Sequence, residues 1–103
     1  ILLVVGILDD KPYNGMLSAL LPACRRAIIT APQIGRAVPA NILAATAQRY
    51  LSDIRHIPEV AQAIRKAIET AGPRDTIVVA GSLYVVGEAI EALQEMGLMP
   101  PTA

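Results

Sequence analysis

The stretch TIVVAGSLYVVGEA, residues 76–89, decides the fold of this chain. Its first part, residues 76–80, is a continuous apolar run rich in β-branched residues, which is typical of a buried strand. A Gly-Ser step then leads into a segment of helical periodicity, where Ser82 is suited to cap the helix and Gly97 to end it. Its inward positions are expected to be Val85, Val86, Ala89, Ile90, Leu93 and Met96. A buried strand that runs directly into an amphipathic helix predicts a layered α/β fold.

The same alternation fills the rest of the chain. Residues 1–7, 26–30 and 52–57 have the pattern of strands, and the segments 13–23, 39–50 and 58–71 have the pattern of helices. In the last of these helices, one apolar face is expected to consist of Val60, Ala61, Ile64, Ala67 and Ile68. Strands that alternate with helices predict βαβ units, a mostly parallel sheet and right-handed crossovers. We therefore expect a βαβαβαβα domain over residues 1–97, followed by a tail at residues 98–103.

Composition narrows the class of protein. A chain of 103 residues with nine basic and nine acidic side chains has the size of one domain and no net charge. That balance argues against a nucleic-acid or anionic-membrane partner, and no apolar run approaches the roughly 20 residues that span a bilayer. The single cysteine, Cys24, is expected to be a small buried residue, and the single histidine, His56, to be structural or exposed. A reducing, cytoplasmic setting follows.

Polar residues gather where the predicted strands end. In open parallel sheets, ligands bind beyond the carboxyl ends of the strands. Four segments lie there, at residues 6–12, 31–38, 56–58 and 80–83. They would form a polar rim of Asp9, Asp10, Lys11, Gln33, Arg36, His56, Ser82 and Tyr84.

Two parts of this rim allow opposite interpretations. The carboxylates of Asp9 and Asp10 could bind a metal or an ammonium group, and Lys11 could bind an anion, or the segment is a turn in which an aspartate caps the next helix. Arg36 could clamp a carboxylate through two parallel hydrogen bonds, or it is a solvated charge in a loop.

The Gly81–Ser82 step is equally open. It lacks the lysine and the spacing of a P-loop and the second early glycine of the dinucleotide fingerprint. It also does not match the G-x-S-x-G nucleophile elbow. Its backbone N–H groups could bind an anion, or Gly81 permits close passage of two backbones while Ser82 caps the helix.

Three motifs together resemble the folylpolyglutamate synthase/dihydrofolate synthase family of Mur-ligase-type enzymes. VVAGSLYVVGEAIEAL (78–93) resembles the family's last strand and helix. VVGILDDKPYNGMLSAL (4–20) resembles its Gly-Met-x-x-Asp-Lys-Asp segment, with Asp10 and Lys11 on the Asp-Lys pair and Pro12 in place of the second Asp. IGRAVPANILA (34–44) resembles its Arg-Ala-x-Pro loop, which aligns Arg36. The likeness runs from about residue 3 to residue 95.

The resemblance implies the Rossmann-like C-terminal domain of an enzyme that uses ATP and magnesium to join glutamate to folate or dihydropteroate through an acyl phosphate. The P-loop and magnesium ligands of that family lie in an N-terminal ATPase domain. Asp10, Lys11, Arg36, Ser82 and Tyr84 would then form the rim that faces substrate or nucleotide. We expect none of them to be catalytic, and we expect neither a metal nor a cofactor on this chain alone.

The resemblance also implies that the chain begins after the first βα unit of the domain. We therefore expect the chain alone to be inactive and to self-associate through an exposed sheet edge or apolar face. The alternative is a stand-alone flavodoxin-like or receiver-like binding module, in which Asp9 and Asp10 would form an acidic pocket. That alternative lacks a phospho-acceptor aspartate, since the strand at 26–30 ends in Thr30.

Overall fold

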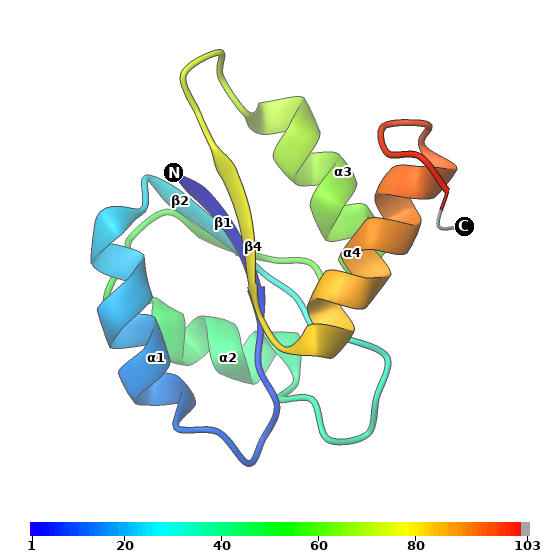
Figure 1. The fold of residues 1–103 in the computed structure, drawn as a ribbon. Coiled ribbons are helices and arrows are strands. Elements are labelled where there is room, and N and C mark those ends of the chain that lie inside the picture. Colours follow the sequence, from blue (N-terminus) through cyan, green and yellow to red (C-terminus); the bar gives the residue numbers. More distant parts are fainter. Residues whose placement is uncertain (102–103) are drawn as a thin grey trace.

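The computed structural model describes residues 1–101, which fold into four strands and four α-helices in strict alternation (Figure 1). The elements are β1 (Leu2–Gly6), α1 (Tyr13–Leu20), β2 (Arg26–Ile29), α2 (Ala40–Ala47), β3 (Ile54–His56), α3 (Val60–Thr70), β4 (Ile77–Gly81) and α4 (Leu83–Glu95). A 3-10 turn at Leu21–Ala23 extends α1. Every predicted strand and helix is present, and the α/β fold class is confirmed.

The four strands form one parallel sheet in the order β3-β2-β1-β4. β1 pairs with both β2 and β4, and all five of its residues are buried. An apolar strand without polar alternation is expected at such a position, since helices cover both of its faces. The connections from β1 to β2 and from β2 to β3 each add a strand on the same side of β1. The connection from β3 then crosses the sheet and places β4 on the other side of β1.

Helices cover the two faces of the sheet in pairs. α1 and α2 pack against Leu3, Val5 and Ile7, which alternate along one face of the chain. α3 and α4 pack against Leu2 and Val4 on the opposite face. The period-2 alternation of a strand thus divides the core into two layers. The helices that follow β1 and β2 lie on one face, and those that follow β3 and β4 lie on the other.

The helix stripes are narrower than the sequence predicts. Val60, Ala63, Ile64 and Ala67 are the buried residues of α3, and Val85, Ala89 and Ala92 those of α4. Ile68 and Ile90, which the periodicity places inward, are 39% and 36% exposed. α3 and α4 pack beside each other on one face of a narrow sheet, so residues at the outer margin of each stripe reach solvent.

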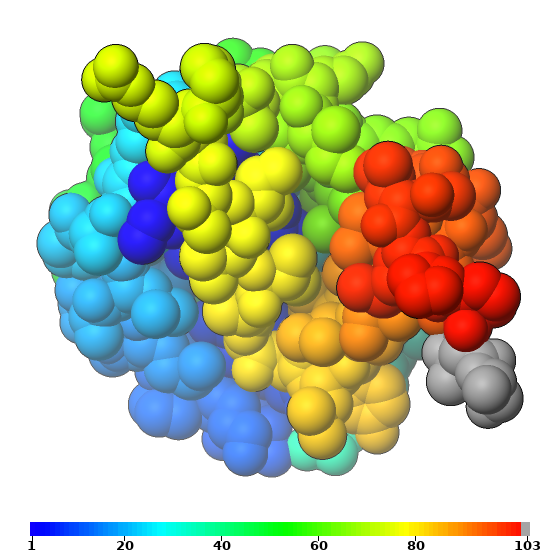
Figure 2. Space-filling view, turned by 45° about the horizontal axis from the view of Figure 1, so that its top comes forward, coloured from blue at the N-terminus to red at the C-terminus, as the bar shows by residue number. Residues whose placement is uncertain are grey.

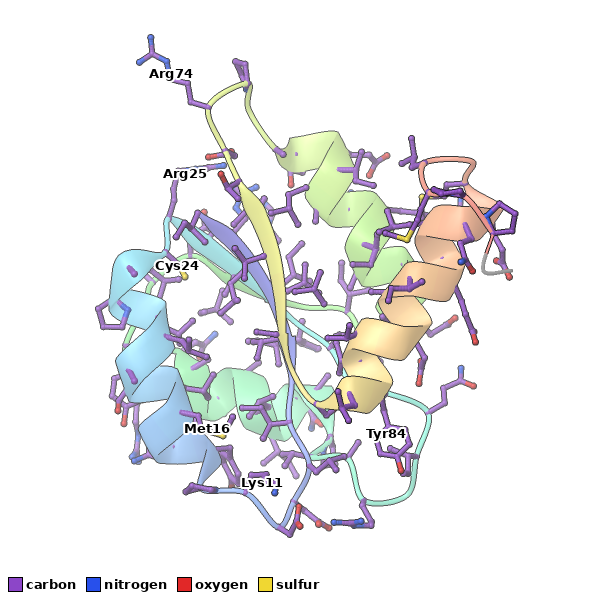
Figure 3. The ribbon with its side chains drawn as sticks, viewed as in Figure 1. Lys11, Met16, Cys24, Arg25, Arg74 and Tyr84 are labelled. Atoms are coloured by element: carbon purple, nitrogen blue, oxygen red, sulfur yellow. The ribbon has the colours of Figure 1, made fainter. Side chains whose placement is uncertain are left out.

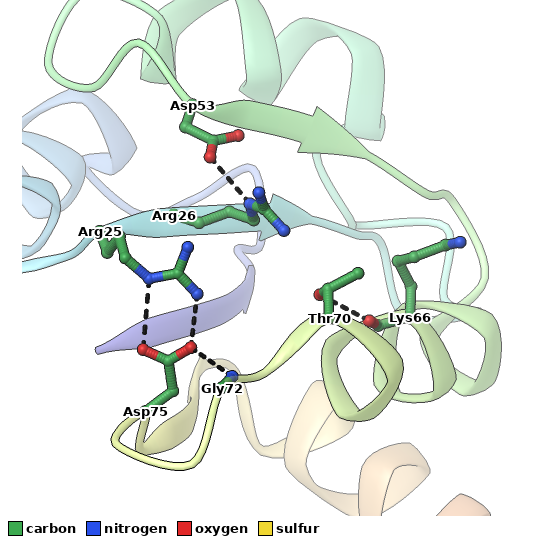
Figure 4. A network of polar contacts seen from close by, with 7 residues as sticks. All are labelled: Arg25, Arg26, Asp53, Lys66, Thr70, Gly72 and Asp75. Carbon is green, nitrogen blue, oxygen red and sulfur yellow. Dashed lines mark hydrogen bonds and ion pairs between the residues drawn. The ribbon is translucent and has the colours of Figure 1, made fainter.

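Ion pairs hold the amino-terminal edge of the sheet together (Figure 4). Arg25 donates from Nε and Nη2 to the two carboxylate oxygens of Asp75, at 3.2 and 2.5 Å. Asp75 also accepts from the Gly72 backbone N–H at 2.7 Å. Arg26 donates to Asp53 at 2.8 Å, which joins β2 to the segment before β3. The contacts of Asp75 with Arg25 and Gly72 hold the loop between α3 and β4 against the start of β2.

Several smaller expectations concern the ends of the chain and its cysteine. Gly97 adopts a φ of +74° directly after α4, which is the left-handed conformation that ends a helix. Residues 98–101 turn back onto α4, where Gln94 Nε2 donates to Pro100 O at 3.2 Å. The rest of the predicted tail lies outside the described residues.

Cys24 is half-buried, and this burial raises the pKa of its thiol. No helix within residues 1–101 combines the length and the apolarity needed to cross a membrane.

Candidate functional site

A pocket of about 280 Å³ lies at the carboxyl ends of β1 and β4. The chain passes from β1 to α1 on one face of the sheet and from β4 to α4 on the other face. These two connections therefore diverge at this point (Figure 1). Such a switch point is where open α/β sheets bind their ligands. The pocket is lined by Ile7, Leu8, Lys11, Gly81, Ser82, Leu83 and Tyr84.

Two glycines form the narrow base of this site. Gly6 and Gly81 are register partners at the ends of β1 and β4. Gly81 has a φ of +119°, and a Cβ atom there would overlap the Gly6 carbonyl oxygen. A Cβ on Gly6 would meet Thr30 O and Val85 Cγ2, each at 2.8 Å. The prediction that Gly81 permits close passage of two backbones is therefore confirmed.

Ser82 caps α4, as the sequence predicts. Its Oγ accepts a hydrogen bond from the Val85 backbone N–H at 3.1 Å, and the residue is buried. This bond uses one of the two acceptor lone pairs of the hydroxyl and leaves its proton for another partner. Ser82 thus both starts the helix and offers a hydrogen-bond donor to the pocket.

Lys11 and Tyr84 approach the same pocket from different elements (Figure 3). Lys11 follows β1, and Tyr84 lies in the first turn of α4. Within residues 1–101 the Lys11 ammonium has no ion-pair partner, whereas Tyr84 and Leu83 are 49% and 88% exposed. The site therefore presents one cation and two hydroxyl groups, those of Ser82 and Tyr84, beside apolar side chains. This arrangement suits a carboxylate joined to a short aliphatic chain.

Asp10 and Arg36 form a pair that neither interpretation of the sequence contained. Arg36 Nη2 donates to Asp10 Oδ2 at 2.8 Å, and the Asp9 backbone N–H donates to Arg36 O at 2.7 Å. An isolated antiparallel bridge between Leu8 and Ala37 lies beside them. The loop after β1 and the loop after β2 are thus fastened to each other, and Arg36 is held by its own chain.

The other rim residues do not line this pocket. The Gln33 backbone N–H donates to Glu88 Oε2 at 2.8 Å, which attaches the loop after β2 to α4. His56 is exposed at the end of β3, as expected. Of the eight predicted rim residues, the pocket unites Lys11, Ser82 and Tyr84. Sequence reasoning overlooked the apolar lining by Leu8 and Leu83, although a leucine directly after Gly-Ser was a visible signal.

A metal ion has no evident site on this part of the protein. Across residues 1–101, no three histidine, cysteine, aspartate or glutamate side chains come together as ligands. Asp9 and Asp10 are adjacent acidic residues beside the pocket, and the Asp10 carboxylate is already hydrogen-bonded to Arg36. We therefore derive no chemical step through a metal on these residues.

The parallel sheet with helices on both faces and a crevice at its switch point is that of a Rossmann-like α/β domain. The chain belongs to the Mur ligase, glutamate ligase domain family, whose family model matches residues 1–83. This match confirms the resemblance found in the sequence motifs.

Individual relatives agree with that family. A probable bifunctional folylpolyglutamate synthase/dihydropteroate synthase from Haloferax volcanii is 34% identical over 88 residues, which cover 84% of this chain and 10% of the relative. The structure of E. coli FolC in complex with DHPP and ADP superposes with a TM-score of 0.83 at 25% identity, over 93% of this chain and 22% of FolC. The structure of folylpolyglutamate synthase from Thermotoga maritima superposes with a TM-score of 0.75 at 30% identity, over 95% of this chain and 22% of that protein. The chain thus spans a tenth of the curated relative and about a fifth of each solved structure.

Proposed function

We propose that this chain is the glutamate-binding domain of an ATP-dependent ligase that joins glutamate to folate or dihydropteroate through an acyl phosphate. The observation that carries the proposal is the pocket at the β1–β4 switch point, where Lys11, Ser82 and Tyr84 meet. The family match and the names of the relatives support the reaction class.

The pocket chemistry fits a glutamate carboxylate. The Lys11 ammonium would neutralise one carboxylate, and the Ser82 hydroxyl, whose oxygen is already bonded to Val85 N–H, would donate its proton to the same group. Ile7 and Leu8 would contact the aliphatic part of the amino acid. Binding in this way holds glutamate at the sheet edge by its carboxylate and leaves its amino group free to react.

The proposed reaction needs a partner domain. The neutral amino nitrogen of glutamate attacks the acyl carbon and the carbon–oxygen bond to phosphate breaks. Inorganic phosphate leaves with the bonding electron pair, and the nitrogen loses one proton, which balances the charge of the departing phosphate. ATP would supply the phosphoryl group that converts the substrate carboxylate into the acyl phosphate, with ADP as the other product and magnesium beside the phosphates, in keeping with relatives whose structures contain ADP, or AMPPNP and a Mn ion. We assign their binding to the other parts of a longer ligase, a domain that this chain would face.

Exposed aromatic and aliphatic side chains beside the pocket suit this surface to contact a second domain when the two domains close over the substrate. Leu83 and Tyr84 stand beside the pocket with large exposed fractions, and Asp10 and Arg36 stiffen the adjacent loops. Docking of this face onto a second domain would cover these side chains and exclude water from the acyl phosphate. The chain alone is expected to bind glutamate without turning it over.

The test is a titration of the 103-residue protein with L-glutamate, followed through backbone amide resonances. We expect the amides of residues 81–85 and of Lys11 to shift, and the shifts to disappear in Lys11→Ala. Lys66→Ala is the matched control, because Lys66 lies on α3 and is paired with Glu69 at 3.3 Å. Shifts of equal size in both variants, or none in the parent protein, would remove the proposed site.

A second test addresses the reaction in the complete gene product. Lys11→Ala is expected to raise the KM for glutamate in glutamate-dependent ADP formation, whereas Lys66→Ala should leave it unchanged. Arg36→Ala frees the two loops that Arg36 joins through Asp10, so it should also impair the reaction. Unchanged kinetics for both Lys11→Ala and Arg36→Ala would contradict their roles.

A further inference from the structure

Two asparagines occupy matching positions in this chain. Asn14 and Asn41 are each the second residue of an eight-residue helix, α1 and α2 respectively, and both are exposed. Each helix begins after a proline N-cap, Pro12 or Pro39, and neither cap makes a side-chain hydrogen bond. The sequence contains no other asparagine, so a difference in reactivity between the two reports on their immediate surroundings.

The residue that follows each asparagine differs. Asn14 precedes Gly15, whereas Asn41 precedes Ile42. The side-chain amide carbon Cγ of an asparagine can be attacked by the backbone nitrogen of the next residue, because this attack closes a five-membered ring. Glycine leaves that nitrogen open to approach, while a β-branched isoleucine shields it. The space around Gly15 is open as well, since a Cβ atom there would meet nothing within 4 Å.

The backbone N–H groups of these following residues are also bonded differently. The Ile42 N–H donates to Pro39 O at 3.0 Å. The Gly15 N–H, by contrast, has no acceptor among residues 1–101. The nitrogen that would attack in α1 therefore loses no hydrogen bond when it reacts, whereas the corresponding nitrogen in α2 would lose one.

The first turn of α1 can open without disturbing the core. A helical backbone keeps the Gly15 nitrogen away from Asn14 Cγ, so this turn must open before the ring can close. The bond from Met16 N–H to Pro12 O at 3.1 Å joins the turn to its cap, and glycine weakens a helix. Leu17 is the buried residue of α1 and holds the rest of the helix in place, so local opening at residues 13–15 costs little free energy.

A tyrosine hydroxyl is directed at the Asn14 amide. The Tyr50 hydroxyl donates to Asn14 Oδ1 at 2.6 Å. When a nitrogen attacks Cγ, negative charge develops on this oxygen, and a donor already aimed at it stabilises that charge. No such donor reaches Asn41 within the described part of the chain. Four features thus distinguish Asn14: the glycine, the open space, the unbonded N–H and the tyrosine.

We propose that the Asn14–Gly15 step is a modification site, at which Asn14 is converted to aspartate and isoaspartate through a cyclic imide. The Gly15 nitrogen gives its proton to a solvent base and bonds to Asn14 Cγ. The Cγ–Nδ2 bond breaks, and ammonia leaves with the bonding electron pair and one proton from water. A water molecule then opens the imide at either carbonyl. The inference is independent of the proposed function.

The two products affect α1 in different ways. Aspartate places a negative charge in the first turn of the helix, where it is favourable, and its carboxylate can still accept from Tyr50. Isoaspartate adds a methylene group to the main chain, so the first turn cannot keep its helical spacing. Position 14 lines a hollow of about 530 Å³ between α1 and α2, together with Lys11 and Arg49, so the conversion changes the charge and shape of this surface.

Incubation of the 103-residue protein at mildly alkaline pH, followed by peptide mass spectrometry, tests the inference. We expect the converted fraction of Asn14 to rise with time and with pH, because the attacking nitrogen must lose its proton. Asn41 should remain an amide over the same period and serves as a control within each molecule. Separation of the product peptides should show isoaspartate beside aspartate, since a ring intermediate gives both.

Reciprocal variants test the role of the following residue. Gly15→Ile should reduce conversion at Asn14 to the level of Asn41, and the open space at Gly15 accommodates the side chain. Ile42→Gly should make Asn41 reactive, because Ile42 is 48% exposed and its removal leaves the core intact. Conversion at Asn41 should still be slower than at Asn14, since it lacks the tyrosine donor. Circular dichroism verifies that both variants are folded.

Tyr50→Phe tests the donor. We expect conversion of Asn14 to slow about fivefold in the folded protein, as for the loss of one hydrogen bond. In urea, where the fold no longer brings Tyr50 to Asn14, the substitution should have no effect. Faster conversion in folded Tyr50→Phe than in the parent protein would overturn the role of the hydroxyl.

Two results would overturn the modification site itself. The first is equal conversion of Asn14 and Asn41 in the parent protein, which would show that neither the glycine nor the local structure matters. The second is aspartate without isoaspartate at position 14, which would show direct hydrolysis of the amide rather than ring closure by the Gly15 nitrogen.

Discussion

Gly6 and Gly81 face each other across the β1–β4 ladder so closely that a side chain on Gly81 would overlap the carbonyl oxygen of Gly6. This approach brings the loop after β1 and the first turn of α4 to one pocket. The geometry at Gly81 therefore supports the fold and the candidate site at once.

Gly81→Ala should destabilise the protein strongly. The substitution forces a Cβ atom into the Gly6 carbonyl and also places alanine at a φ of +119°, which costs about 1–3 kcal/mol in backbone strain alone. Gly87→Ala is the control, because Gly87 lies inside α4 with open space around it, and alanine there should stabilise by about 0.5–1 kcal/mol. Urea unfolding measures both, and equal midpoints would refute the role of the close approach.

Ser82→Ala should lower the free energy of unfolding by about 1 kcal/mol through loss of the helix cap. The Val85 N–H would lose its partner in a buried position. Ser18→Ala removes an exposed hydroxyl that donates to Gly15 O at 2.8 Å, so it should change stability little. Thermal unfolding of the two variants distinguishes the loss of the helix cap from a general effect of replacing serine by alanine. Similar losses of stability in both variants would argue against the cap.

The Arg25–Asp75 pair should make stability depend on pH at the acidic end. The hydrogen bond from Arg25, followed by that from the Gly72 N–H, lowers the pKa of Asp75. A carboxylate with a lowered pKa in the folded state stabilises the protein above the ordinary aspartate pKa of about 3.9, and this contribution is lost as the pH falls through the lower folded pKa. Asp75→Asn should therefore be less stable than the parent protein at pH 7, and this deficit should shrink below about pH 4. A deficit that stays constant down to pH 2 in urea titrations would contradict the pair.

The free edge of β4 should promote self-association. β4 ends the strand order, and its residues Ile77–Ala80 are apolar and half-buried. The strand lies open at the front of Figure 2, where it is coloured yellow. An unpaired apolar edge invites pairing with another chain, so light scattering should show a dimer whose fraction rises with concentration.

A charge on that edge should return the dimer to monomer. Val78→Lys tests this, and Ile42→Lys is its control, since Ile42 is 48% exposed on α2, away from the β4 edge. Circular dichroism would verify that Val78→Lys remains folded. A parent protein that stays monomeric at high concentration would rule out the edge contact.

The sequence alone determined the elements of this fold, because strand and helix periodicity are local properties of the chain. It placed TIVVA in a strand, Ser82 at the cap of α4 and Gly97 at its end, and the structure agrees on these three elements. The expected burial of that strand was wrong: β4 is half-buried, because it lies at the edge of the sheet. Ile68 and Ile90 show where such reasoning fails: their exposure depends on how far a neighbouring helix reaches, which periodicity does not contain.

Only the tertiary structure decided which rim residues act together. The sequence offered Arg36 as a carboxylate clamp or a solvated charge, and the fold gave it Asp10 as a partner. It offered Lys11 and Ser82 as separate possibilities, and the pairing of β1 with β4 brought both to one pocket. The physical reason is that strand order and loop contacts arise from residues far apart along the chain, whose encounter is set by packing of the whole sheet.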